Sequence, residues 1–172
     1  MSEGRLGGDM SNSQSIEWRD GEIHDCPITP LEKYRDGRGW LAEFFRHDEL
    51  ESGSYPVMGY ISMTKSGVAR GPHEHRDQSD LFVFFNGTFR LYLWDARPDS
   101  PTFGIRHIVD LGVENPASAI VPPGVVHAYR NIGNRDAMII NCPNRLYSGF
   151  GKKESVDEIR HEDRSDDMFA MD

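Results

Sequence analysis

Two short stretches of this sequence constrain its fold more than any other feature. The first, GVARGPHEHRDQSDLFVFFNG, spans residues 67–87, and the second, PPGVVHAYRN, spans residues 122–131. Alternate side chains share one face of an extended strand, so we expect His73 and His75 to point the same way. A barrel that also brings in Asp80 and His127 would place three imidazoles and one carboxylate in one cavity. Such a set can hold a divalent metal or move protons.

The same two stretches resemble the two sequence motifs of the cupin superfamily. The first motif, in which this chain has Asp where Glu is usual, is matched by Gly67, His73, His75, Asp80 and Gly87. The second motif, whose leading Gly is replaced here by Pro116, is matched by Pro122, Gly124, His127 and Asn131. The resemblance implies an all-β fold, the antiparallel double-stranded β-helix known as the cupin jelly roll.

Short apolar segments separated by turn signals predict the same class of fold. We expect strands at 38–46, 57–65, 81–86, 88–95, 105–111, 118–121, 126–131 and 136–142. The dipeptide Asn86-Gly87 tolerates positive φ angles and so predicts a tight hairpin that pairs 81–86 with 88–95. The one short helix that the pattern suggests is at 47–52.

The length of 172 residues suits one domain with a substantial core. Residues 1–25 are rich in Gly, Ser, Asn and charge, which indicates a flexible or loosely docked extension. We expect the jelly-roll domain at 26–160 and a polar, acidic tail at 161–172.

Composition excludes some classes of partner. The formal charge of −9, without a basic cluster, argues against a nucleic-acid partner. Cys26 and Cys142 lie far apart, and we expect both to be reduced thiols. No segment resembles a signal peptide or reaches the roughly 20 apolar residues of a membrane span. We therefore expect a soluble cytoplasmic protein that does not bind membranes.

Within the cupins, the chain resembles the dTDP-4-dehydrorhamnose 3,5-epimerase family. The resemblance is carried by DGRGWLAE (36–43), GVARGPH (67–73), SPTFG (100–104) and the Pro-Pro-Gly turn before His127. It runs from about Ile28 to His161. It implies an isomerase that removes a proton beside the ketone of a nucleotide-linked 4-keto-6-deoxy sugar, needs no cofactor and forms a homodimer.

The resemblance also implies roles for particular residues. His73 is the implied base, and Tyr147 the implied group that returns a proton from the opposite face. A base with a pKa near neutrality suits this chemistry, which explains the histidine. Arg70, near the substrate phosphates, and His127 complete the expected catalytic set. The implied substrate-binding residues are Arg38, Glu43 and Arg70.

Two departures from the family leave the chemistry open. His75 replaces a Gln, and Asp80 replaces a Lys that steadies the enolate oxygen. An enolate would be repelled by Asp80. An Fe, Mn, Ni or Zn ion held by His73, His75, Asp80 and His127 would restore positive charge, but a metal-bound His73 has no lone pair to accept a proton.

Three functions therefore remain as alternatives. They are the epimerase, a metal-dependent dioxygenase, isomerase or lyase, and a non-catalytic sugar-binding barrel. Asp80 has the simpler interpretation of a solvated strand start, and Arg38 and Glu43 that of a surface pair on an edge strand. Met58 and Tyr60 stand where the family has Gln and Asn, so the sequence leaves the sugar and nucleobase specificity undecided.

Overall fold

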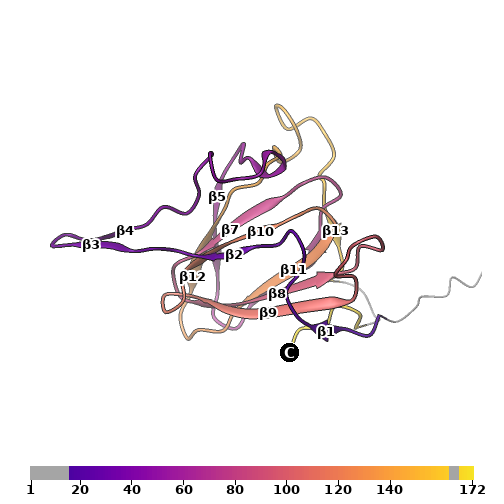
Figure 1. The fold of residues 1–172 in the computed structure, drawn as a ribbon, viewed down its shortest axis with the longest axis horizontal. Helices are drawn as coiled ribbons and strands as arrows, with labels where there is room; N and C mark the ends of the chain where they lie inside the picture. Colours follow the sequence, from indigo (N-terminus) through magenta and orange to yellow (C-terminus); the bar gives the residue numbers. More distant parts are fainter. Residues whose placement is uncertain (1–15, 163–166) are drawn as a thin grey trace, which may run out of the picture.

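The computed structural model describes residues 16–162 and 167–172, which form a sandwich of two β-sheets (Figure 1). The first sheet has the order β1 (Arg19–Asp20), β9 (Ile105–Gly112), β8 (Thr88–Asp95), β11 (Val125–Asn131), β6 (Ala69–Glu74) and β13 (Ile159–Arg160). The second has the order β2 (Ile28–Pro30), β10 (Ala117–Val121), β7 (Asp80–Phe84), β12 (Ala137–Asn141) and β5 (Tyr60–Thr64). These strands pair antiparallel except for β1 with β9. The expected jelly roll is confirmed.

A separate hairpin of β3 (Tyr34–Asp36) and β4 (Gly39–Leu41) projects from the sandwich as an arm (Figure 1). The predicted strand at 38–46 is thus much shorter than expected. The predicted helix at 47–52 is wrong, because this segment is irregular up to its last residue, where one 3-10 turn begins (Ser52–Ser54). This part of the chain lies along the outer face of the second sheet, where Phe44 and Leu50 pack against Leu81 and its neighbours.

The predicted hairpin at Asn86-Gly87 is also wrong, because β7 and β8 belong to different sheets. Both edges of β7 are occupied by β10 and β12, and both edges of β8 by β9 and β11. The turn therefore carries the chain from one sheet to the other. Gly87 has a φ of 70° there, and an added Cβ would collide with the side chain of Ala137.

The packed domain extends beyond both of its expected ends. Ile23 is 5% exposed and belongs to the core between the sheets. Trp18 and Phe169, with ring centroids 5.8 Å apart, cover the outer side of the first sheet above the buried Trp94. Residues 16–25 and 167–172 are therefore docked rather than a loose extension and tail, because β8 is apolar on both faces and needs a cover on each. The remainder of the expected extension, 1–15, lies outside the described residues.

Within the described ranges, no helix has the length and apolar character needed to cross a membrane.

Candidate active site

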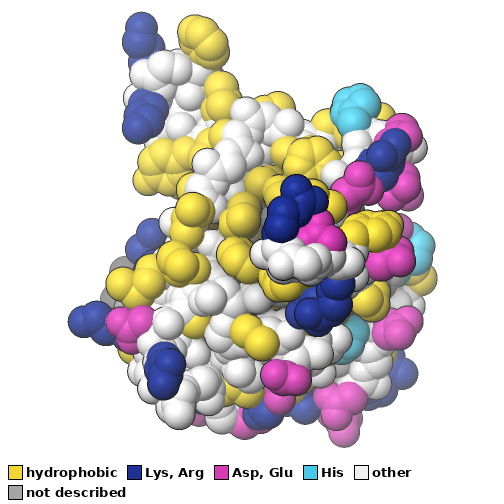
Figure 2. Space-filling view, turned by 90° about the vertical axis from the view of Figure 1, so that its left-hand side faces the viewer, with side chains coloured by type: hydrophobic (Ala, Val, Ile, Leu, Met, Phe, Trp, Pro, Cys, Tyr) yellow, Lys and Arg dark blue, Asp and Glu magenta, His cyan; other side chains and the backbone are white. Residues whose placement is uncertain are grey.

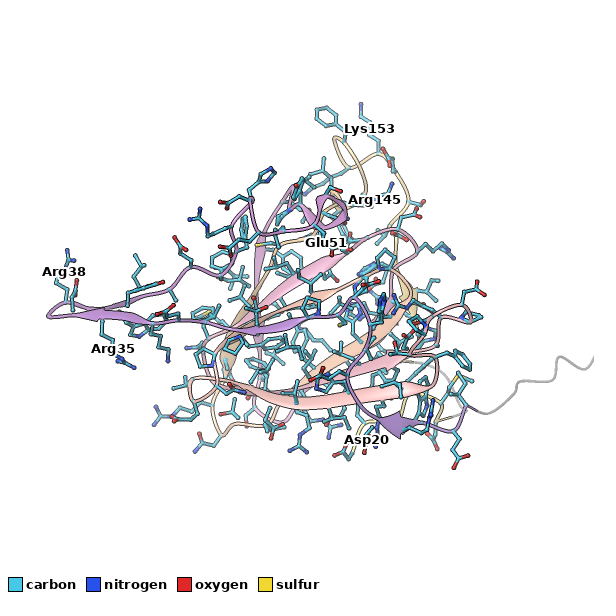
Figure 3. The ribbon with its side chains drawn as sticks, viewed as in Figure 1. Asp20, Arg35, Arg38, Glu51, Arg145 and Lys153 are labelled. Carbon is cyan, nitrogen blue, oxygen red and sulfur yellow. The ribbon has the colours of Figure 1, made fainter. Side chains whose placement is uncertain are left out.

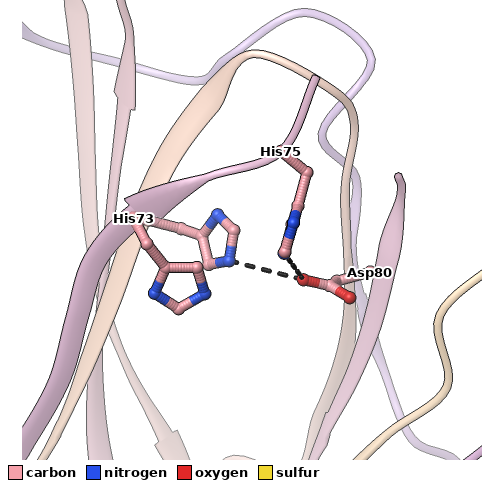
Figure 4. A group of neighbouring side chains, drawn as sticks. His73, His75 and Asp80 are labelled. Carbon is pink, nitrogen blue, oxygen red and sulfur yellow. Dashed lines mark ion pairs between the residues drawn. The ribbon is translucent and has the colours of Figure 1, made fainter. Parts of the chain in front are cut away.

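Three strands bring the expected cluster together inside the barrel. His73 is on β6, His75 directly follows it, Asp80 begins β7 and His127 is on β11, in register with His73. One ligand atom from each of the four residues lies within 4.8 Å of the others. The ring centroids of His73 and His127 are 4.3 Å apart. Figure 4 shows His73, His75 and Asp80 gathered at this point. The spacing in the sequence therefore predicts this cluster correctly.

Asp80 is the buried anion at the centre of the cluster. It is 1% exposed, which rules out a solvated strand start. Its Oδ2 lies 3.1 Å from His75 Nε2 and 3.4 Å from His127 Nε2, while its Oδ1 accepts hydrogen bonds from Gln78 and Asn141. Burial alone would raise the pKa of Asp80, but its interactions with His127 and His75 outweigh burial and lower it. The side chain is therefore a carboxylate.

The three histidines differ in how they are held. His127 Nδ1 lies 3.0 Å from the carbonyl oxygen of Val125, and His75 Nδ1 contacts the carbonyl oxygen of Asp157. Donation to these carbonyls leaves the Nε2 atoms facing Asp80. Of the buried atoms in the described residues, His127 Nε2 is one that has no hydrogen-bond partner. Burial, with the neighbouring histidines, lowers the pKa of His73 to about 2. The ring is therefore neutral and has a free lone pair, but its pKa lies well below the near-neutral value expected of the base.

A cavity of about 350 Å³ opens onto the cluster. Tyr60, His73 and His75 line it together with a strap formed by residues 143–158. A second hollow, lined by Arg70 and Tyr129, shares Tyr60 and His73 with the first. His73 therefore stands in the wall between two spaces that a substrate can occupy.

The strap is fastened by Asp157. Its carboxylate accepts hydrogen bonds from the backbone N–H groups of Arg76, Asp77 and Gln78, at 2.9, 2.9 and 3.0 Å. Its carbonyl is the group that contacts His75 Nδ1. One residue of the strap thus fixes both the loop after β6 and the orientation of a cluster histidine.

Tyr147 and Arg70 lie at the cavities, as expected. Tyr147 is on the strap, lines the main cavity and is 59% exposed. Arg70 lines the second hollow, where its guanidinium donates to Thr64 Oγ1 at 3.2 Å and to the carbonyl of Met63 at 3.0 Å. These contacts with β5 hold the positive charge in place.

Arg38 and Glu43, in contrast, are not brought to either cavity of their own chain. Arg38 lies at the end of the arm (Figure 3), with a side chain that is 92% exposed and paired with Asp36. The Glu43 side chain is 57% exposed and lies 3.7 Å from Arg46. The expected substrate-binding set is therefore incomplete within one chain.

Comparison with known proteins identifies the family. The model of the dTDP-4-dehydrorhamnose 3,5-epimerase family matches residues 20–165. The chain belongs to this family. The probable low-salt glycan biosynthesis epimerase Agl13 of Haloferax volcanii is 37% identical over 126 residues, which cover 73% of this chain and 81% of that protein. The spore coat polysaccharide biosynthesis protein SpsL of Bacillus subtilis is 38% identical over 130 residues, 73% of this chain and 83% of that protein.

A solved structure agrees with this assignment. The dTDP-6-deoxy-D-glucose-3,5-epimerase RmlC of Legionella pneumophila, in complex with dTDP-4-keto-L-rhamnose, superposes with a TM-score of 0.71 at 25% identity. The match covers 89% of this chain and 80% of that one. The protein is therefore an epimerase, an isomerase of nucleotide-linked 4-keto-6-deoxy sugars, and the non-catalytic barrel is set aside.

The epimerase site contains residues that sequence reasoning missed. Asn141 donates to the hydroxyl of Tyr60 at 2.8 Å and to Asp80 Oδ1 at 3.0 Å, so it links the cavity wall to the buried anion. Asp157, which orients His75, lies in a polar stretch with no motif to mark it. His161 lies outside this site: its Nε2 is 2.9 Å from Glu74 Oε1, and its ring packs against Phe169.

The donor set of the epimerase fits a transition metal. Three imidazole nitrogens and one carboxylate oxygen are ligands that Fe, Mn, Ni and Zn accept. The same residues also suit proton transfer, because the cavity reaches a neutral imidazole beside a fixed carboxylate.

Proposed function

We propose that His73 is the base of the epimerase. The observation that carries this role is the position of His73 in the wall shared by both cavities. The carbon–hydrogen bond beside the 4-ketone breaks and its proton moves to an imidazole nitrogen of His73. The electron pair forms a carbon–carbon double bond, and the ketone oxygen takes the negative charge.

Tyr147 returns a proton to the opposite face of the same carbon, which inverts the centre. Its position on the strap supports this role, because a 59% exposed phenol can be reprotonated from solvent. Arg70 faces the second hollow, where its charge suits the diphosphate of the nucleotide. His127, beside His73, completes the catalytic set by fixing Asp80.

A homodimer would bring Arg38 and Glu43 to a substrate. The arm carries Tyr34, Trp40 and Leu41, which are 54%, 45% and 63% exposed. Figure 2 shows hydrophobic side chains gathered on this face of the molecule. On β5, an edge strand of the second sheet, Ile61 and Met63 are 68% and 50% exposed. A second copy of the chain is the occupant that covers this face and receives the arm.

The dimer has a direct test. Sedimentation velocity at micromolar concentration should give a dimer for the wild type and a monomer for Met63→Glu. Arg38→Ala should remain dimeric but bind dTDP more weakly. A monomeric wild type would contradict the dimer and the role of the arm together.

The reaction is tested by hydrogen exchange in heavy water. Deuterium should enter carbon 3, carbon 5 or both of a nucleotide-linked 4-keto-6-deoxy sugar, and His73→Asn should suppress this by about 10²–10⁴-fold, the usual contribution of a general base. His24→Asn is the matched control, since His24 is a half-exposed histidine paired with Asp25. No exchange across several such sugars, where a related epimerase shows it, would refute the proposal.

A metal-dependent reaction is the second candidate, favoured by the three histidines around Asp80. The epimerase itself needs no cofactor if His73 and Tyr147 act alone. We place the enzyme in the cytoplasm, and the two buried free thiols of Cys26 and Cys142 support this location.

A further inference from the structure

Two of the three histidines in the cluster are held alike around Asp80, and the third is not. His75 and His127 each direct Nε2 at the same oxygen, Asp80 Oδ2, at 3.1 and 3.4 Å. Each has its Nδ1 against a main-chain carbonyl, that of Asp157 or of Val125. In the part of the chain that the structure describes, neither ring nitrogen of His73 has a hydrogen-bond partner.

This arrangement brings lone pairs together. When neither ring carries a second proton, both Nδ1 atoms donate to carbonyls and the Nε2 lone pairs of His75 and His127 face Asp80 Oδ2, so these three atoms repel one another. A proton on either Nε2 turns that contact into a hydrogen bond to the carboxylate. Gln78 lies 3.2 Å from His75 Nε2 and relieves part of this repulsion. His127 Nε2 stays buried without a hydrogen-bond partner, in a side chain that is 1% exposed. One added proton satisfies one imidazole, whereas a divalent cation satisfies all three atoms.

We propose that His75, Asp80 and His127 bind one divalent transition-metal ion and that His73 stays outside the coordination sphere as the base. Two histidines and one carboxylate are a known ligand set for such ions, with positions left open. Carbonyl acceptors at Nδ1 are the usual outer support of metal-bound histidines. Gln78 and Asn141 occupy Asp80 Oδ1 and leave Oδ2 for the ion.

If His73 is not a ligand, the site can hold a metal ion and still use His73 as the base. This inference rests on the proposed enolisation, in which negative charge develops on the ketone oxygen. Asp80 stands where the family resemblance implies a cation, so the charge at this place has the wrong sign for an enolate. A bound ion supplies the missing positive charge, and His73 keeps a lone pair for the proton.

Metal binding can be measured without substrate. Untagged protein, stripped with a chelator and shown by circular dichroism to remain folded, should bind one equivalent of Co(II) or Zn(II) by elemental analysis and Co(II) absorption. Asp80→Asn and His127→Ala should weaken binding by more than the roughly 10–100-fold that is typical of losing an outer support. His73→Asn should bind the metal within about threefold of the wild type, as should the control His24→Asn. If Asp80→Asn or His127→Ala does not fold, His75→Gln is measured in its place.

The outcomes separate the metal site from the reaction. Loss of metal in His73→Asn, equal to that in Asp80→Asn, would make His73 a ligand and overturn the inference. Folded wild-type protein that binds no metal would also overturn it, and if that protein still exchanged deuterium, the epimerase would stand. Metal binding with the expected pattern but without exchange would support the metal site and refute the proposed reaction.

Discussion

Asp95, at the end of β8, is the residue whose replacement we expect to cost the most stability away from the site. It is fully buried and accepts hydrogen bonds from Ser100 Oγ at 2.5 Å and Thr102 Oγ1 at 2.6 Å. The guanidinium of Arg97 donates to both of its oxygens, at 2.8 and 2.9 Å, and also to the carbonyl of His24. The string SPTFG, for which the sequence offers no catalytic reason, therefore has a structural one.

The size of the effect follows from the pKa of this carboxyl. Burial would raise it, but the hydrogen bonds from Arg97, Ser100 and Thr102 outweigh burial and lower the pKa from 3.8 to about 2. At about 1.4 kcal/mol per pKa unit, this difference stabilises the fold by roughly 2 kcal/mol. Asp95→Asn also leaves Arg97 without its anion, so we expect a loss of about 2–4 kcal/mol. The midpoint of thermal unfolding should fall by roughly 5–15 °C.

Urea unfolding followed by circular dichroism measures this loss, with Asp110→Asn as the matched control. Asp110 also pairs with an arginine, at 2.7 Å from Arg90, but both side chains are partly exposed, so its replacement should cost about 1 kcal/mol or less. Because the folded pKa of Asp95 is the lower one, its contribution is complete above about pH 4 and is lost as the pH falls toward 2. The difference in stability between the wild type and Asp95→Asn should therefore narrow by roughly 2 kcal/mol in that range. Equal losses in the two variants, or a constant difference from pH 5 to 2, would refute the reasoning.

Three further predictions concern the turn, a thiol and the implied acid. Gly87→Ala should lower the free energy of unfolding in urea by about 1–3 kcal/mol or more, because φ is 70° and the added methyl group would meet Ala137. Gly37→Ala is the control: its methyl group would meet no atom within 4 Å, so the free energy of unfolding should hardly change. Burial raises the pKa of the Cys26 thiol to about 12, so a thiol reagent should label it only after unfolding, and rapid labelling of the folded protein would contradict this. Tyr147→Phe should keep deuterium exchange but lose inversion, as measured by NMR of the product, and full inversion would remove Tyr147 as the acid.

Local patterns predict the strands and the cluster well. The segment 88–95 is found as predicted because its run of apolar and aromatic residues, which favours a strand, lies within the segment itself. His73 and His75 share a face for the same reason. Local patterns do not, however, predict which strands pair with each other. Asn86-Gly87 is a hairpin signal, but β7 pairs with β10 and β12, whose residues are distant in sequence.

The same limit applies to the site. Tyr60 and Asn141 are 81 residues apart and meet only through the register of β5 with β12. Asp157 reaches His75 from 82 residues away. The family resemblance transfers the type of residue at Arg38 but not its place in space, because the arm leaves its own barrel.

Because Asp157 is attached both to the loop after β6 and to His75, the position of the strap also determines whether the site is ordered. A strap that swung away from the cavity by releasing this residue would free three backbone N–H groups and the ring of His75 in one step. The open enzyme would then lack an ordered site, and order would return only with closure. With the strap open, a bulky nucleotide sugar could enter but the site would not be ordered. With the strap closed, the site would be ordered but the route of entry would be shut. Designers who exchange the strap to change the substrate must keep an aspartate at this place.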